Sequence, residues 1–269
     1  MPGAVTIGTT QDGAVFVAPG YLPCGVCEPC QSGLHMACLD PWRPGWNAPG
    51  GMSAELHVPA AFLVPLSGDD GRRAETAALL AAAGPTYQAV AVSGMAPGDT
   101  VLVFGDPGPG ALPLRLLAGL GLRPVWVCDA SPPLPLPPDV LVTTTLPPPE
   151  ELPSPRRHLL DLTPSPGSLE RWAPAAGTCV SCTLVGPTAP TTLPRLDQIL
   201  AGEAVLRRAR DLHPHLALDL AALVSADRVD MTGTVELHDL ESIAPALSAL
   251  ARGGGERWPV LARASTDER

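Results

Sequence analysis

The chain has 269 residues, of which 45% are hydrophobic and 16% are charged. This balance is typical of a folded globular protein rather than a disordered one. All 17 basic residues are arginine, so there is no lysine to form a Schiff base or to serve a phosphate-binding P-loop. The net charge of −10 argues against a nucleic-acid partner, because binding to a phosphate backbone depends on clustered positive charge.

The sequence also bears on location. Residues 1–10 contain no basic segment of the kind that opens a secretion signal, and no apolar run approaches the ~18 residues of a membrane span. Four of the seven cysteines cluster at the spacing of metal ligands, and a reducing compartment keeps such thiols free. We therefore expect a cytoplasmic protein with no membrane partner.

The first third of the chain is predicted to contain short strands, loops and one helix. A strand is expected at 14–18, and two strands divided by Pro59 are expected within 51–66. An alanine-rich pattern then predicts a helix over 72–93, interrupted at Pro85 because proline removes a helical hydrogen-bond donor.

The middle of the chain alternates between strand and helix patterns. Strands are predicted at 100–104, 125–128, 140–144, 158–162 and 179–185, and helices at 111–120, 168–173, 196–210 and 215–223. The proline-rich stretch 131–155 is predicted to be an extended linker around one short strand. Such alternation predicts a parallel α/β sheet.

The tail is predicted to contain a strand at 235–237, a helix at 240–251 and a strand at 260–261. Together with the strand-rich first part, it suggests a second, discontinuous domain. The fold class expected is therefore α/β, with a second domain assembled from both ends of the chain.

Four cysteines are the strongest signal of chemistry in the sequence. They lie three, three and eight residues apart, in the stretch CGVCEPCQSGLHMAC, at Cys24, Cys27, Cys30 and Cys38. Zinc takes four such thiolates at tetrahedral corners, and Gly25 and Gly33 would relieve the backbone at the bends. The spacing favours zinc over an iron–sulfur cluster or metal-free thiols. A site filled by four thiolates is structural, because it leaves no position for water or substrate.

Other cysteines and histidines are expected to be structural. His35 lies inside the cysteine-rich lobe, where a surface role is expected because four cysteines already complete the site. Cys179 and Cys182 are predicted to lie buried on opposite sides of one strand, and Cys128 is predicted to be buried at a strand end. The close pair in His213-Pro-His215 is expected to occupy a surface loop.

With these motifs in order, the chain resembles the zinc-containing alcohol dehydrogenase-like medium-chain dehydrogenase/reductase family. The resemblance rests on LPCGVCEPCQSGLHMAC (22–38), GGMSAELHVPAAFLVPL (50–66), TYQAVAVSGMAPGDTVLVFG (86–105), and a glycine loop followed by a strand that ends in Asp129. Within the family, the wording GGMSAE and then TYQAV looks most similar to 6-hydroxycyclohex-1-ene-1-carbonyl-CoA dehydrogenase.

The resemblance implies a division of the chain. Residues 1–84 would form a partial, β-rich GroES-like catalytic domain that contains the structural zinc lobe. Residues 85–225 would form a Rossmann-like nucleotide-binding domain, and 226–269 would return to the catalytic domain. Members of the family pair through an edge strand of the Rossmann sheet. A homodimer is therefore expected, with 179–185 or a later strand as the candidate edge.

The resemblance also implies a place for NAD over the loop 105–110, with its ribose near Asp129. The dinucleotide fingerprint Gly-x-Gly-x-x-Gly uses its middle glycine to let the backbone approach the pyrophosphate. Here Gly105 and Gly110 match the first and third glycines, Pro107 replaces the middle one, and Gly108 offers a shifted alternative. Asp129 follows Gly105 at a spacing compatible with NAD rather than NADP.

The family's catalytic zinc ligands do not appear. The 23 residues before Cys24 contain neither cysteine nor histidine, and the expected third position falls in LAAAG (80–84), which has no metal-binding side chain. The catalytic residues are therefore unknown. Two functions follow: an NAD-dependent oxidoreductase acting on a secondary or cyclic alcohol, with a hydroxyacyl-CoA as one such substrate, or a pseudoenzyme that keeps only the structural zinc and the fold.

Overall fold

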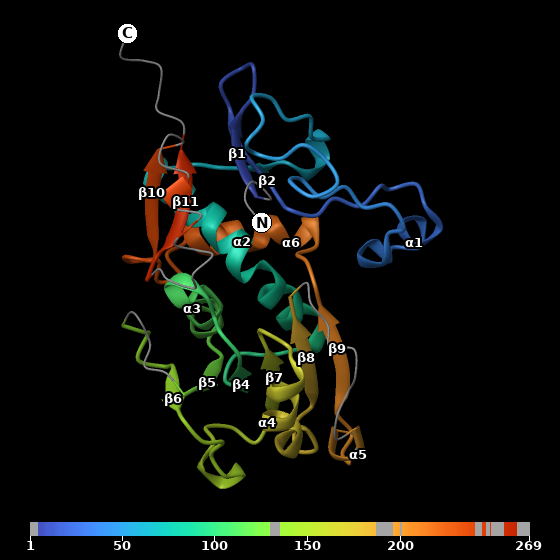
Figure 1. Ribbon diagram of the computed structural model, residues 1–269, viewed down its shortest axis with the longest axis vertical. Coiled ribbons are helices and arrows are strands. Elements are labelled where there is room, and N and C mark those ends of the chain that lie inside the picture. The colour runs from blue at the N-terminus through green and yellow to red at the C-terminus, as the bar shows by residue number, and fades with distance from the viewer. Residues whose placement is uncertain are drawn as a thin grey trace.

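The computed structural model describes residues 5–129, 135–186, 196–199, 201–239, 244–245, 248 and 256–262. Its main body is a six-stranded parallel sheet with the strand order β6-β5-β4-β7-β8-β9 (Figure 1). The strands are β4 (Thr100–Phe104), β5 (Arg123–Val127), β6 (Leu141–Thr143), β7 (Arg157–Asp161), β8 (Ser181–Val185) and β9 (Val205–Ala209). Numbered from the first strand of the sheet, this is the 3-2-1-4-5-6 order of a dinucleotide-binding fold. The predicted parallel α/β sheet is confirmed.

Helices cover both faces of this sheet because its central strands are apolar on both sides. Along β4, Val101 and Val103 pack against α2 (Asp70–Ser93) and α3 (Leu112–Gly119), whereas Leu102 and Phe104 pack against α4 (Pro166–Ala176). A sixth helix, α6 (Pro214–Ser225), lies along α2 and shares a core with it. The alternation of strand side chains thus divides the interior into two layers.

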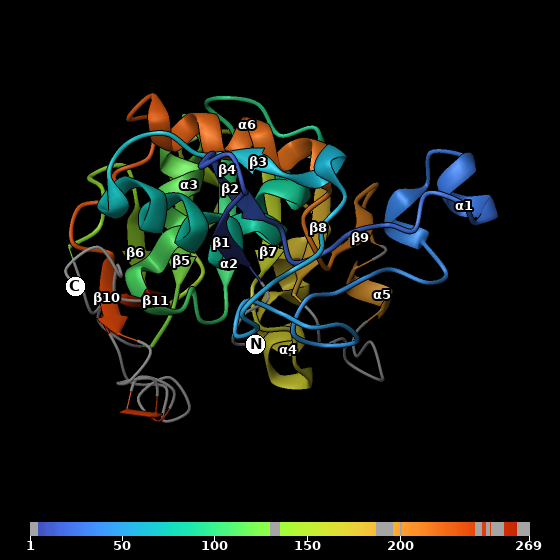
Figure 2. The same ribbon diagram turned by 90° about the horizontal axis from the view of Figure 1, so that it is seen from above.

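A second unit lies beyond the helices. It contains an antiparallel sheet of β1 (Thr6–Thr9), β2 (Val15–Ala18) and β3 (Val64–Pro65), and a parallel pair of β10 (Val235–Asp239) and β11 (Trp258–Ala262). The cysteine-rich lobe contains α1 (Glu28–Gln31) and the short 3-10 helix η1 (His35–Ala37), and it projects beyond the β9 side of the sheet in both views (Figures 1 and 2). Both ends of the chain therefore contribute to this unit.

The helix α2 corrects one prediction. It runs without a break from Asp70 to Ser93, with Pro85 inside it. Proline removes one hydrogen bond, but Ala83 and Ala89 on either side are fully buried, and their packing holds the helix together. Asp69 caps the start of the helix, since its side chain accepts the Arg72 N–H, and Gly94 caps the end with a φ of +64°.

Two further predictions were wrong in part. In 51–66, residues before Pro59 form turns and irregular chain, and the short 3-10 helix η2 (Ala60–Phe62) precedes β3. The predicted helix 196–210 divides into α5 (Leu196–Ile199) and the strand β9, because β8 offers an unpaired edge that β9 completes. Most of the predicted helix 240–251 lies outside the described residues.

The proline-rich stretch behaves as predicted where it is described. It holds the short strand β6 and the 3-10 helix η4 (Pro149–Glu151), and no α-helix lies within 135–155. The sheet edge is correspondingly open, since Leu141 is 47% exposed and Val142 is 36% exposed. Among the described residues, no helix is long and apolar enough to cross a membrane.

Candidate functional site

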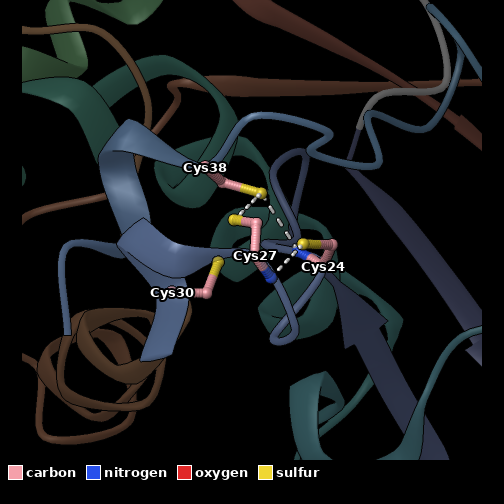
Figure 3. A group of neighbouring side chains, drawn as sticks. All are labelled: Cys24, Cys27, Cys30 and Cys38. Atoms are coloured by element: carbon pink, nitrogen blue, oxygen red, sulfur yellow. Dashed lines mark hydrogen bonds between the residues drawn. The ribbon is translucent and has the colours of Figure 1, made fainter. Parts of the chain in front are cut away.

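The four cysteines of the lobe converge on one point (Figure 3). The sulfur atoms of Cys24, Cys27, Cys30 and Cys38 all lie within 4.8 Å of one another, and Cys30 is buried. The base of the lobe is closed by Leu22 and Trp42, which exchange two backbone hydrogen bonds of 2.9 and 2.8 Å. The arrangement could therefore hold one zinc ion by four thiolates.

The backbone of the lobe is arranged to favour thiolates. The N–H of Cys24 donates to Cys38 Sγ at 3.2 Å, and the N–H of Cys27 donates to Cys24 Sγ at 3.4 Å. Hydrogen bonds from the backbone N–H groups of Leu39 and Cys30 lower the pKa of the Cys27 thiol to about 6. Burial has the opposite effect on Cys30 and raises the pKa of its thiol to about 12. Since metal binds the thiolate rather than the thiol, the donors favour a cation at Cys27, and at Cys30 the ion itself would have to displace the proton.

Glycines make the tight path of the lobe possible, as the sequence predicted. Gly25 has a φ of +75° and Gly33 a φ of +78°, a region that residues with a side chain rarely adopt. The Gly33 N–H donates to the Cys30 carbonyl at 3.1 Å, which closes the turn after α1. The two-residue gaps between the first three cysteines thus allow the chain to curl around one centre.

The loop 105–110 lies between the carboxyl ends of β4 and β7, where the order of the sheet reverses. This is the position at which open α/β sheets bind ligands. Gly105 has a φ of +87°, and a Cβ there would collide with Thr163 Oγ1, so only glycine fits. The indole N–H of Trp126 donates to the Gly105 carbonyl at 3.0 Å and fixes the start of the loop.

The backbone donors of this loop are already used within the chain. Asp106 N donates to Thr163 Oγ1 at 3.2 Å, and Gly108 N donates to the Asp106 carboxylate at 2.8 Å. Gly110 N donates to the Glu256 carbonyl at 2.8 Å, and Ala111 N donates to the Gly108 carbonyl at 3.1 Å.

The remaining positions of the loop cannot donate at all. Pro107 and Pro109 have no N–H, and Pro107 is buried. No backbone N–H from 106 to 111 is left for a pyrophosphate in this arrangement, although a Cβ at Gly108 would meet only open space.

Asp129, the residue expected near the ribose, is exposed just beyond β5 and paired with an arginine. Its carboxylate accepts from the guanidinium of Arg171 in α4 at 3.1 and 3.5 Å. Both side chains are largely exposed, so the pair contributes little to stability. A ribose hydroxyl would compete with Arg171 for the same carboxylate oxygens.

The buried thiols differ from the sequence prediction in one respect. Cys128, Cys179 and Cys182 are all buried, as expected. However, β8 begins only at Ser181, so Cys179 lies in the turn after α4, and strand alternation does not apply to it. Both thiols pack in the core beside Trp172, and the hydrogen bond between them lowers the pKa of Cys179 and raises that of Cys182.

Sequence reasoning missed three buried polar side chains that are linked by hydrogen bonds. His158 Nε2 lies 3.1 Å from Asp99 Oδ2, and His158 Nδ1 lies 2.8 Å from Ser181 Oγ. The three residue types match those of a serine hydrolase triad, but His158 is fully buried and Ser181 is 1% exposed. They lie at the amino ends of the strands, opposite the nucleotide loop, so the geometry assigns them to the interior. No spacing in the sequence signals this group.

The histidines correct another expectation. His213 and His215 open α6, and the half-buried His35 of the lobe lies against them, with its Nδ1 2.8 Å from His213 Nε2. Burial, together with the charges that His215 and His35 would carry, lowers the pKa of His213. The pair is therefore part of a contact between the lobe and α6 rather than a free surface loop.

Parts of this chain are similar in sequence to known dehydrogenases. No family model matches the sequence. An alcohol dehydrogenase from Geobacillus stearothermophilus is 33% identical over 107 residues, which cover 40% of this chain and 31% of that relative. L-galactonate-5-dehydrogenase from Escherichia coli is 32% identical over 126 residues, which cover 47% of this chain and 36% of the relative. The matched stretches thus span about a third of these curated relatives.

Solved structures resemble the chain over much more of its length. A thermostable alcohol dehydrogenase from Pyrobaculum aerophilum superposes with a TM-score of 0.68 at 19% identity, covering 93% of this chain and 75% of that one. Galactitol-1-phosphate dehydrogenase from Escherichia coli superposes with a TM-score of 0.68 at 16% identity, covering 93% of this chain and 77% of that one.

The chain has the alcohol dehydrogenase fold. In sequence, parts of the chain are similar to an alcohol dehydrogenase and to L-galactonate-5-dehydrogenase, and the finer resemblance to 6-hydroxycyclohex-1-ene-1-carbonyl-CoA dehydrogenase is not confirmed by these neighbours. One structural neighbour, an Escherichia coli alcohol dehydrogenase with a TM-score of 0.69 and 17% identity, is complexed with NADH and is covered over 77% of its length.

Proposed function

We propose that this chain is a zinc-stabilised, alcohol dehydrogenase-like protein that does not bind a dinucleotide in the family's usual way and acts as a non-catalytic binding or scaffolding subunit. The observation that carries the proposal is the state of the loop 105–110. The backbone N–H groups from Asp106 to Ala111 are all donated within the chain, and the two prolines of the loop have none. A pyrophosphate depends on such donors at the start of the helix that follows the loop.

A negative charge adds to this obstacle. The Asp106 carboxylate caps the Gly108 N–H, the position that a phosphate oxygen would take. Two like charges at one donor repel each other, and moving Asp106 away would cost its hydrogen bond. Binding would also require the Glu256 carbonyl to release the Gly110 N–H.

Zinc in this proposal is structural. The thiolates of Cys24, Cys27, Cys30 and Cys38 would hold it, and the N–H groups directed at their sulfurs fit that role. The ion would supply cross-linking of the lobe and no reaction chemistry, because four protein ligands leave it no open position. The lobe then keeps the shape in which it contacts α6.

A second candidate is NAD-dependent oxidation of a secondary or cyclic alcohol, including a hydroxyacyl-CoA. Asp129 favours it, because an acidic residue at the end of the second strand suits the ribose hydroxyls of NAD. The open space beside Gly108 also favours it, because a ligand could approach the backbone there. This candidate needs the loop to rearrange and Asp129 to leave Arg171.

We also propose that two copies of the chain pair through β9. The order of the sheet places β9 at an edge and β8 inside it. Of the two candidates from the sequence, the edge strand is therefore the later one, β9, and not 179–185. Val205 on β9 is 46% exposed.

The division of the chain into domains at 1–84, 85–225 and 226–269 stays a proposal. The continuous helix α2 crosses the first of these boundaries.

Calorimetric titration of the purified, metal-analysed chain with NAD and NADH tests the main proposal. No binding is expected at millimolar cofactor. The double variant Asp106→Ala with Pro107→Gly restores the glycine fingerprint and removes the charge, so it should bind more tightly than the natural chain.

Micromolar binding by the natural chain would overturn the proposal and favour the dehydrogenase. In that case Asp129→Asn should weaken the binding of NAD, whereas Asp139→Asn, in a turn before β6, should leave it unchanged. Turnover of cyclic alcohols would then be measured with the same preparation.

A further inference from the structure

Three imidazole rings from two distant parts of the sequence meet beside the lobe. His35 comes from η1, and His213 and His215 open α6, yet their ligand nitrogens all lie within 4.8 Å of one another. The rings of His213 and His215 are stacked at a centroid distance of 4.9 Å, and His35 lies 4.9 Å from His213. The four lobe cysteines form the other such group among the described residues.

The backbone fixes two of these residues independently of their rings. The His35 carbonyl accepts from the Tyr21 hydroxyl at 2.6 Å and from Cys38 N at 3.1 Å. The His213 N–H donates to Gln88 Oε1 of α2 at 3.0 Å. Structure on both sides therefore holds the rings together, and a strong attraction between the rings is not needed to explain their proximity.

The rings themselves have few partners. His213 Nδ1 accepts the N–H of His215 at 3.2 Å, so a neutral His213 carries its proton on Nε2 and donates it to His35 Nδ1. Neutral imidazoles that share a hydrogen bond in this way present lone pairs that a cation can take.

We propose that His35, His213 and His215 form a second metal site, for a divalent transition ion that clamps the zinc lobe onto α6. Imidazole suits zinc, cobalt, nickel and copper, whereas magnesium and calcium prefer oxygen ligands. Three histidines leave at least one position of the ion open, and the exposed ring of His215 directs that position to solvent. This site does not depend on whether the chain binds a dinucleotide.

Binding requires only small changes. A tetrahedral ion with bonds of about 2.0–2.1 Å holds its nitrogens about 3.3 Å apart, so the 2.8 Å pair must open by about half an ångström. The His213 proton moves from Nε2 to Nδ1, and the 3.2 Å bond from the His215 N–H is released. The exposed ring of His215 must also turn so that one of its nitrogens points at the ion.

The metal content of the full chain tests this site. Protein equilibrated with excess zinc and then freed of unbound metal should contain two zinc ions per chain. The double variant His213→Asn with His215→Gln should contain one, since asparagine still caps α6 and His215 is exposed, so the fold should be retained. The exposed His57→Gln serves as the matched control and should contain two.

Cobalt identifies which site each ion occupies. Thiolate-to-cobalt charge-transfer absorption reports the cysteine lobe, and it should be equally strong in the natural chain and in the double variant. One ion per chain in the natural protein, with full thiolate absorption, would overturn the proposal. So would a double variant that still holds two ions.

Discussion

At the scale of single residues, His158 shows how a buried titratable group ties stability to pH. Burial lowers its pKa from the ordinary value of 6.5, against the opposing effect of Asp99. Burial would raise the pKa of Asp99, but hydrogen bonds from Ala96 N, Arg156 and His158 outweigh it, and the pKa lies below 3.8. Both groups have a lower pKa in the folded state, so both contribute stability that is present at neutral pH and lost in acid.

The free energy of unfolding should therefore fall as the pH drops below 6.5, because the unfolded chain takes up a proton that buried His158 does not. His158→Gln should reduce the fall between pH 7.5 and pH 5, and it should cost about 1–3 kcal/mol at pH 7.5 by disturbing the bonds to Asp99 and Ser181. Urea unfolding at several pH values measures both effects. The control variant His57→Gln should show the same decrease in the free energy of unfolding between pH 7.5 and pH 5 as the natural chain. If His158→Gln also showed that full decrease, this account would be contradicted.

Glycines of the nucleotide loop differ in what they tolerate. Gly105→Ala should destabilise the chain by on the order of 3 kcal/mol, because its φ is +87° and the new methyl group would collide with Thr163. Gly108→Ala, with a φ of +72°, a ψ of −178° and open space around it, should cost less, about 2 kcal/mol, from backbone strain alone. Thermal and urea unfolding compare the two variants. Equal losses would mean that contact with Thr163 is not what requires glycine at 105.

At the scale of elements, β9 is where local sequence and global structure disagree. Its residues fit a helical pattern, yet the chain forms a strand because β8 has an edge to be paired. Among the described residues no strand pairs with the outer edge of β9, which is why we propose it as the pairing edge.

Sedimentation of the natural chain should give the mass of a dimer if β9 is the pairing edge. Val205→Lys should shift the equilibrium toward monomer, because a charged side chain opposes edge-to-edge pairing. Leu218→Lys alters an equally exposed residue of α6 and should leave the dimer intact. A monomeric natural chain would end the proposal.

At the scale of the whole molecule, the zinc lobe is a module beside the main sheet rather than part of its core. The three apolar clusters of the described residues lie around the helices and strands of the body, and no lobe residue belongs to them. Metal thus takes the place of a hydrophobic core in the lobe.

Removing zinc with a chelator should therefore unfold the lobe and leave the sheet folded. Hydrogen exchange should rise at the amides of Cys24 and Cys27 and remain slow in β4. Zinc present at 100 times its dissociation constant adds about 2.7 kcal/mol to the stability of the lobe, so added zinc should restore protection at those amides. Loss of protection in β4 at the same time would show that the lobe and sheet unfold together.

The sequence by itself determined the parts of this protein that local rules govern. Buried strands such as Thr100–Phe104 are apolar at every position after the first, and the spacing of Cys24, Cys27, Cys30 and Cys38 matches the reach of the chain around one ion. Substitution of the middle fingerprint glycine by Pro107 was also visible, because a motif is a property of neighbouring residues.

Only the tertiary structure decided the features that join distant residues. It kept α2 helical through Pro85, made a strand of 205–209, and brought Asp99, His158 and Ser181 into one buried chain. It also carried His35 to His213 across 178 positions of sequence and engaged the donors of the nucleotide loop with Thr163 and Glu256. Packing against distant neighbours outweighs local propensity at such places, and no pattern along the chain records which neighbours those are.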